Sequence, residues 1–431
     1  MTGGAQGIQA ICAMLGGILV ARFLGPEAKG QLTVLVALGA MAVLLASLGV
    51  HQSAIYFLGR HKEERDAIVS NNTLFALGGA VVTTALLAAI GVTFHDQLLS
   101  GVPLTLFFAY LLAVPFNYVT EFVRRTILGT GKVSIYNVPD LAQGASLLFG
   151  TAIVILIFGE HVLPLAVLRV VTEGAVAAFL LIYLWRVVRF RMHPSRRVLR
   201  QQVGYGVKNY ASSLFWLFLF SSDALLVNHF LGNERTGVYS VAVSLGLPIT
   251  MVGAVIGTLV FQRVAANEDE ATRVANTNRV VRVLIPFALT LVVAVGVGSQ
   301  WLIPALYGNA FDDATIALLL LLPGFLALAI ETVVMNFLAG DGSPPIVYWG
   351  PFIGLVVNLG ANLYVIPRWG INGAAVTSSV GYVVVLVLVL GYYLRWTRSR
   401  LSEVVLPRRA DLHALIRTDA PPASAARLGA T

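Results

Sequence analysis

The chain has 431 residues, of which 57% are hydrophobic and only 12% are charged, and its formal net charge is +8. A soluble globular domain carries about 25% charged residues, so this composition excludes a soluble fold. Apolar runs of about 20 residues, the length of a membrane-crossing helix, recur along the whole chain. The sequence therefore predicts an all-α polytopic membrane protein.

The N-terminal half is expected to hold six membrane spans within residues 1–185. Residues 1–23 show neither the basic region nor the cleavage site of a signal peptide, so the first apolar run is interpreted as a retained span. A basic segment with Pro194 at its middle follows at 186–206 and is interpreted as a cytoplasmic linker. The expected spans lie near residues 5–22, 31–58, 68–93, 103–126, 137–158 and 162–185.

The C-terminal half is expected to hold six more spans within residues 207–396. Residues 397–431, which include the stretch PPASAARLGAT, are interpreted as a disordered cytoplasmic tail. The expected spans lie near residues 207–230, 237–262, 282–303, 312–338, 346–366 and 371–394.

The distribution of lysine and arginine predicts the orientation of these twelve spans. With the N-terminus placed in the cytoplasm, 24 of the 29 basic residues fall in cytoplasmic connections and the tail, and four fall in outer connections. The four are Arg22, Lys29, Arg235 and Arg368. An excess of basic residues in cytoplasmic loops is the usual bias of membrane proteins, so both termini are expected to be cytoplasmic.

Three motifs repeat at nearly constant spacing. The segment 23–30 reads FLGPEAKG and the segment 230–237 reads FLGNERTG, an offset of 207 residues. Gly131 ends a turn that matches the turn ending at Gly342, and Gly159 stands in a turn that matches the turn at Gly370. The offset of each pair is 211 residues. A repeat of six spans places both copies in the membrane in the same direction, so we expect two six-helix lobes related by a pseudo-twofold axis along the membrane normal.

The chain resembles polysaccharide exporters of the Wzx type, which share a superfamily with multidrug and toxin extruders and lipid II flippases. Three stretches carry the resemblance: ARFLGPEAKG (21–30), SSDALLVNHFLGNERTGVYS (221–240) and YVIPRWGINGAA (364–375). The resemblance implies alternating access around a cavity between the lobes. It also implies a polyprenyl-diphosphate-linked oligosaccharide as substrate, moved from the cytoplasmic to the outer leaflet of a bacterial inner membrane.

Several polar residues within or beside the spans are candidates for contact with such a substrate. A diphosphate favours basic side chains, and arginine in particular matches its oxygens. Two amides four residues apart in the eleventh span are candidates for sugar contact, with hydrogen bonding to another helix as the alternative. The headgroup candidates are Arg124, Arg125, Lys208, Arg169 and Arg282, and the sugar candidates are Asn358 and Asn362.

Three carboxylates inside expected spans are candidates for ion coupling, because a charge there is costly and usually serves a purpose. Asp223 has no charged counterpart in the first half, and it is a candidate for binding a coupling proton or sodium ion. Glu331 and Glu173 are further candidates. Glu173 lies four residues after Arg169, so the alternative is a neutralising pair on one helical face.

Enzymatic chemistry is not expected. The stretch Gly129–Lys132 departs from a phosphate-binding loop at Thr126 and Val133, and Cys12 is the only cysteine. No cofactor, metal or nucleic-acid partner is expected. A cation-coupled extruder of organic cations and a membrane polysaccharide polymerase remain as alternatives. Expected partners are membrane lipids and, for a flippase, polysaccharide assembly proteins such as a polymerase. The sequence leaves the oligomeric state open, with function as a monomer expected.

Overall fold

The computed structural model describes residues 2–265 and 269–407, and within these ranges the regular structure is entirely helical. The first half of the chain begins with one long helix and continues through shorter ones. Its helices are α1 (Thr2–Ser47), α2 (Val50–Arg60), η1 (Lys62–Glu64), α3 (Arg65–Thr93), α4 (His95–Leu98), α5 (Leu104–Leu111), α6 (Val114–Gly129), α7 (Val133–Tyr136), α8 (Val138–Ala145), η2 (Ser146–Gly150), α9 (Thr151–Phe158), α10 (Leu163–Tyr183) and η3 (Leu184–Val188).

The second half consists mostly of long helices. They are α11 (Arg196–Ala265), α12 (Glu270–Leu306), η4 (Asn309–Phe311), α13 (Ala314–Gly340), α14 (Ile346–Thr397) and α15 (Leu401–Val405). Within the described ranges, nine helical stretches are long and apolar enough to cross a membrane. The prediction of a polytopic helical membrane protein is confirmed.

Three of these nine stretches bend sharply at a glycine. Gly25 in α1 has φ 79° and ψ 179°, Gly232 in α11 has φ 81° and ψ 178°, and Gly370 in α14 has φ 59° and ψ −143°. Residues with a Cβ rarely adopt such positive φ values, which is why glycine stands at each bend. Each bend divides its helix into two segments that run in different directions.

The repeated motifs share backbone conformation as well as sequence. Gly25 and Gly232, which occupy the same place in the two copies of the first motif, agree within a few degrees in both torsion angles. Gly159 (φ 65°, ψ −134°) likewise resembles Gly370. Gly131 and Gly342 both have positive φ, at 85° and 111°. The torsion angles therefore repeat where the sequence repeats.

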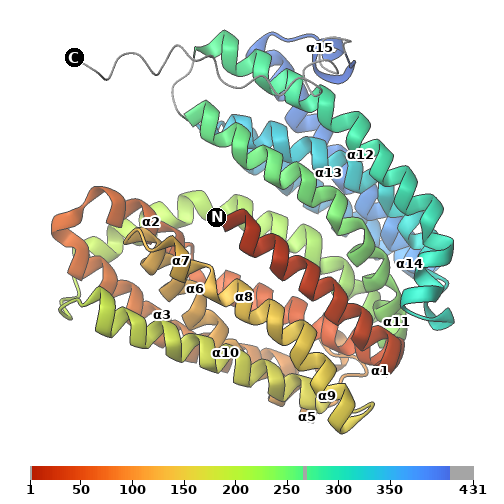
Figure 1. Ribbon diagram of the computed structural model, residues 1–431, viewed down its shortest axis with the longest axis horizontal. Helices are drawn as coiled ribbons and strands as arrows, with labels where there is room; N and C mark the ends of the chain where they lie inside the picture. The colour runs from red at the N-terminus through yellow and green to blue at the C-terminus, as the bar shows by residue number, and fades with distance from the viewer. Residues whose placement is uncertain (1, 266–268, 408–431) are drawn as a thin grey trace, which may run out of the picture.

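Buried side chains form two large clusters, one in each half. The first runs from Val34 to Val198, and the second is built almost wholly from residues between Leu219 and Val404. Figure 1 shows two bundles that diverge near the N-terminus and converge where α1 and α11 turn. Helix α1 packs along α11 between them.

Part of the 186–206 linker is helical, and so is part of the tail, for which disorder is expected from the sequence. Helix α11 begins at Arg196, so the second half of the 186–206 segment continues directly into the seventh span. Val198 packs in the core of the first half, and Gln202 is hydrogen-bonded to Asn71 and Asn72. Part of the tail forms α15, whose Val404 is buried. Residues 408–431 of the tail lie outside the described residues.

Candidate functional site

The two repeated segments, 23–30 and 230–237, pack against each other where the halves converge. A Cβ added to Gly30 would lie 1.8 Å from the Asn233 carbonyl oxygen, and one added to Gly237 would lie 1.9 Å from the Pro26 carbonyl oxygen. Only glycine allows backbones this close. We call this pair of contacts the elbow contact. It closes one end of the space between the halves.

A cavity of about 430 Å³ lies between the halves beside the elbow contact. Its walls come from both segments of α1, from α5, α8, η2, α9 and α10 of the first half, and from α11 of the second. Most of the lining is apolar, as is usual for a binding pocket. The polar and charged lining residues are Lys29, Thr33, Tyr110, Gln143, Ser146, Thr151, Arg169, Thr172, Glu173, Ser221, Tyr239, Ser240 and Ser244.

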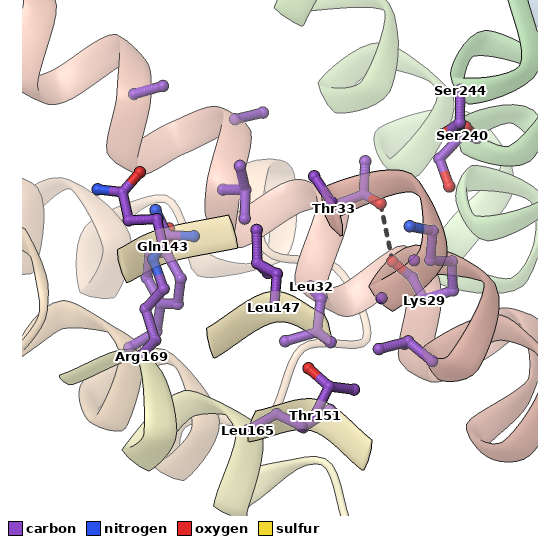
Figure 2. A pocket seen from close by; sticks show the side chains of 18 of the residues that line it. Lys29, Leu32, Thr33, Gln143, Leu147, Thr151, Leu165, Arg169, Ser240 and Ser244 are labelled. Carbon is purple, nitrogen blue, oxygen red and sulfur yellow. Dashed lines mark hydrogen bonds between the residues drawn. The ribbon is translucent and has the colours of Figure 1, made fainter. Parts of the chain in front are cut away.

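Lys29 projects into this central cavity. Figure 2 shows its side chain on the side of the cavity where Ser240 and Ser244 also lie, while its backbone carbonyl accepts a hydrogen bond from Thr33 Oγ1 at 2.8 Å. The Nζ atom lies beside the backbone of Gly17, 3.2 Å from where a Cβ would stand. Among the described residues, no carboxylate forms an ion pair with it. Lys29 therefore offers the cavity a basic side chain that has no acidic partner among the described residues.

Arg169 and Glu173 lie on the opposite wall, one turn apart on α10. Arg169 Nη2 is 3.3 Å from Glu173 Oε1, as expected for an i, i+4 pair. Gln143 donates hydrogen bonds to both Glu173 oxygens at 3.1 and 3.3 Å, and Gln9 donates to Gln143 at 3.0 Å. The side chain of Glu173 is fully buried, whereas that of Arg169 is 27% exposed. Glu173 thus anchors Arg169, whose guanidinium faces the cavity.

A second polar cluster is buried in the second half, around Asp223. Its Oδ1 accepts a hydrogen bond from Asn362 Nδ2 at 2.7 Å, and its Oδ2 accepts from Tyr239 OH at 3.1 Å and from Ser378 Oγ. Asn362 also donates to Asn358 Oδ1 at 3.1 Å and accepts from Thr377. All six residues are at most 3% exposed. We call this set the Asp223 cluster.

The Asp223 cluster joins two helices and reaches the central cavity. Asp223 and Tyr239 lie on α11, before and after its bend, and the other four residues lie on α14. Tyr239 also lines the cavity, so its phenol connects the buried carboxylate to the cavity wall. Asn358 and Asn362, the candidates for sugar contact, do not line the cavity and bond within this cluster instead.

Arg124 and Arg125 lie away from the central cavity, in contact with acidic side chains. Arg124 is 2.9 Å from a Glu121 oxygen and 2.7 Å from Asp140 Oδ1, and its guanidinium lies over the Tyr136 ring. Arg125 Nε is 3.5 Å from the other Glu121 oxygen. In this conformation both arginines are neutralised by the protein.

The remaining candidates are scattered. Arg282 is 7% exposed and donates to the Glu403 carbonyl, so it fixes α15 to α12. Glu331 is 1% exposed on α13, and its Oε1 has no hydrogen-bond partner among the described residues. The side chain of Lys208 lies outside the described residues. Of the four headgroup candidates whose side chains are described, Arg169 alone lines the central cavity.

Sequence reasoning missed Lys29 and Tyr239. From the sequence, Lys29 is expected in an outer loop because it follows the Gly25 turn, but the helix resumes at once and directs the side chain inward. Tyr239 lies 16 residues after Asp223, too far along one helix to suggest contact without the bend at Gly232. The repeated glycines Gly25 and Gly232 are the one sequence signal for these bends, and so for the inward direction of Lys29 and the contact between Tyr239 and Asp223.

Comparison with known sequences identifies related proteins. The profile of the family described as "Polysaccharide biosynthesis protein" matches residues 1–262, more than half of the chain. A protein of Shigella flexneri named "Putative O-antigen transporter" is 22% identical over 399 residues, which cover 89% of this chain and 93% of that protein.

Comparison with solved structures identifies the fold. A lipid II flippase, MurJ, in an inward closed conformation is similar with a TM-score of 0.74 and 12% identity, covering 96% of this chain and 90% of that chain. A multidrug resistance MATE family transporter in an inward-facing conformation gives a TM-score of 0.70 and 16% identity over 96% of both chains. An outward-facing MATE transporter gives 0.57, covering 92% of this chain and 96% of that one. At such low identity the similarity establishes the shared fold alone.

Proposed function

Because this chain belongs to the polysaccharide biosynthesis protein family, we propose that it is a flippase for a lipid-linked oligosaccharide in a bacterial inner membrane. Its substrate is a polyprenyl-diphosphate-linked repeat unit, which it moves from the cytoplasmic to the outer leaflet. The observation that carries the proposal is the charge of the central cavity: among the described residues, its lining has two basic side chains, Lys29 and Arg169, and one carboxylate, which is paired with Arg169.

The charge of the cavity favours an anionic headgroup over an organic cation. A diphosphate needs donors in a water-poor site, where charge-assisted hydrogen bonds are strong. Lys29 has no acidic partner in the described part of the chain, and Arg169 is held in place by a fully buried carboxylate. The serine and threonine hydroxyls that line the same cavity can bond to sugar hydroxyls. An extruder of organic cations would need the opposite charge.

We propose that the nine apolar stretches cross the membrane as twelve spans, because three of them turn back at Gly25, Gly232 and Gly370. Two six-span lobes are then related by a pseudo-twofold axis, as the matching torsion angles support. Both termini lie in the cytoplasm, so the elbow contact closes the outer side. The conformation described here is then inward-facing.

We further propose that Asp223 binds the coupling cation, either a proton or sodium. The carboxylate of Asp223 and the hydroxyl oxygens of Tyr239 and Ser378 converge there, and hard oxygen donors of this kind suit a small cation. A cation taken up by Asp223 competes with the Tyr239 hydrogen bond. Tyr239 lines the cavity, so occupancy of Asp223 and the shape of the cavity are coupled.

Deletion of the gene tests the proposed function. Lipid-linked oligosaccharides are measured by mass spectrometry, and their leaflet is assigned by access to an added glycosidase. We expect completed, diphosphate-linked repeat units to build up on the cytoplasmic side and to clear when the gene is restored. Intact surface polysaccharide without any build-up, in cells that have no second flippase gene, would contradict the proposal.

A further inference from the structure

A second pocket, of about 350 Å³, opens on the side of the molecule where the elbow contact lies. It is formed where the bends of α11 and α14 meet the start of α13. We call it the outer pocket, and the residues that matter for its chemistry are Leu231, Arg235, Asp313, Ile316, Trp369 and Asn372. None of them lines the central cavity.

The outer pocket combines an aromatic platform with planar polar groups. The Trp369 side chain is 64% exposed, so its indole face is available to a ligand. Arg235 and Asp313 form an ion pair across the pocket while remaining 50% and 65% exposed. Asn372 Oδ1 is buried and accepts no hydrogen bond from any described residue. Such an orphaned acceptor indicates a missing donor.

These groups favour a neutral, polyhydroxylated ligand. Among the described lining residues, the one cation and the one anion neutralise each other, so a charged ligand would meet no uncompensated charge from them. A sugar ring has an apolar face that suits an aromatic ring, and hydroxyls that both donate and accept. Carboxylate, amide and guanidinium groups can bond such hydroxyls. The volume lies in the range of roughly 300–1,000 Å³ that is usual for small-molecule sites.

The position of the outer pocket, next to the elbow contact, indicates what a saccharide site there would do. Arg235 is two residues from Asn233, whose carbonyl closes the elbow contact against Gly30. In the proposed orientation, the outer pocket lies on the side through which a glycan would leave the central cavity once the elbow contact opens. We propose that the outer pocket is a saccharide-binding subsite that holds the glycan of the transported lipid as it leaves. The inference rests on the proposed function and orientation.

The alternative role for Trp369 is an interfacial anchor, which is common for tryptophan in membrane proteins. Trp301, on α12, provides a matched comparison because it is 67% exposed and lies outside the outer pocket. If Trp369 is only an anchor, replacing either tryptophan should have the same effect on glycan binding. If the outer pocket binds saccharide, only the replacement of Trp369 should weaken it.

The test is saturation-transfer NMR on the full chain in lipid nanodiscs. The probe is the soluble, phosphate-free oligosaccharide released by mild acid from the surface polysaccharide of the cell that encodes the chain. We expect binding to the wild type, an affinity about tenfold lower for Trp369→Ala, and partial recovery for Trp369→Phe, which keeps an aromatic platform. Trp301→Ala should bind like the wild type.

Two outcomes would overturn the subsite. One is the absence of binding to the wild type, and the other is a Trp369→Ala variant that binds as the wild type does. The double variant Arg169→Gln/Glu173→Gln, in the central cavity, separates the subsite from the flippase function: it leaves no buried carboxylate unpaired, and it should stop transport and leave glycan binding intact. If this double variant abolishes binding while Trp369→Ala does not, the glycan binds in the central cavity and the outer pocket is not its site.

Discussion

Gly30 and Asn233, one from each copy of the repeated motif, are in backbone contact: a Cβ on Gly30 would lie 1.8 Å from the Asn233 carbonyl oxygen. The same relationship holds between Gly237 and Pro26. The repeated motif therefore does more than form a turn: each copy supplies the glycine against which the backbone of the other copy packs. In the proposed orientation, this contact is the closed outer gate.

Replacing Gly30 with alanine should therefore keep the outer gate from closing. Overpacking costs about 1–3 kcal/mol, which shifts a conformational equilibrium by roughly 5- to 150-fold. We expect surface polysaccharide to fall about tenfold. In a Cys12→Ala background, a cysteine placed at Thr33 in the central cavity should react faster with an impermeant maleimide added from outside. Gly360→Ala is the control, because a Cβ at Gly360 meets nothing within 4 Å. Equal labelling of the two variants would contradict a gate at Gly30.

Removing the charge of Lys29 should impair transport without unfolding the protein. Lys29 has no ion-pair partner among the described residues, so Lys29→Gln leaves no carboxylate unpaired. We expect transport to fall about tenfold, the size of one charge-assisted hydrogen bond, and Lys29→Arg to retain most of it. Lys132→Gln, at an exposed position outside the cavity, is the control. Normal transport by Lys29→Gln at normal protein levels would rule out a headgroup role.

Arg169 and Glu173 should depend on each other for stability, whereas transport should depend on Arg169 whether or not Glu173 is present. Arg169→Gln leaves a fully buried carboxylate without its cation, which should cost about 3 kcal/mol. The double variant Arg169→Gln/Glu173→Gln should regain most of the stability but none of the transport. Thermal unfolding in detergent and a polysaccharide assay measure the two effects. A double variant that regains transport would show that the pair only stabilises the bundle.

Arg124 is expected to stabilise the first half rather than bind substrate. Its charge is matched by Glu121 and Asp140, so Arg124→Gln should destabilise the protein, and Asp140→Asn should compensate in the double variant. Thermal stability and transport should recover together. If stability recovers and transport does not, Arg124 contacts the headgroup in another conformation.

Asp223→Asn should remove the dependence of transport on a cation gradient. The amide keeps the size of the carboxylate and loses its charge, so the cluster with Asn362 and Tyr239 can persist without binding a cation. Transport in vesicles is measured with an imposed sodium or proton gradient. Asp96→Asn, at an exposed position outside the cluster, is the control. A variant that still responds to the gradient as the wild type does would exclude Asp223 as the cation site.

The sequence predicted local features better than contacts between distant residues. Gly25 and Gly232 could be placed at turns, and Arg169 could be paired with Glu173, because both inferences need only neighbouring residues. The Arg124–Asp140 pair was not predictable, because it joins two helices whose rotation depends on packing. The position of Lys29 was not predictable for a related reason. A side chain just after a turn can face either the loop or the cavity, and which one it faces depends on the direction of the helix after the turn.

The measurement that decides whether the protein moves its lipid across the membrane uses purified protein in liposomes. The liposomes carry the lipid-linked oligosaccharide isolated from cells that lack the gene, and an added glycosidase reports how much is exposed outside. With the wild type, the fraction accessible to the enzyme should rise with time beyond its starting value, and with Lys29→Gln it should rise far more slowly. A wild-type time course that matches protein-free liposomes, under imposed sodium and proton gradients alike, would contradict the flippase function.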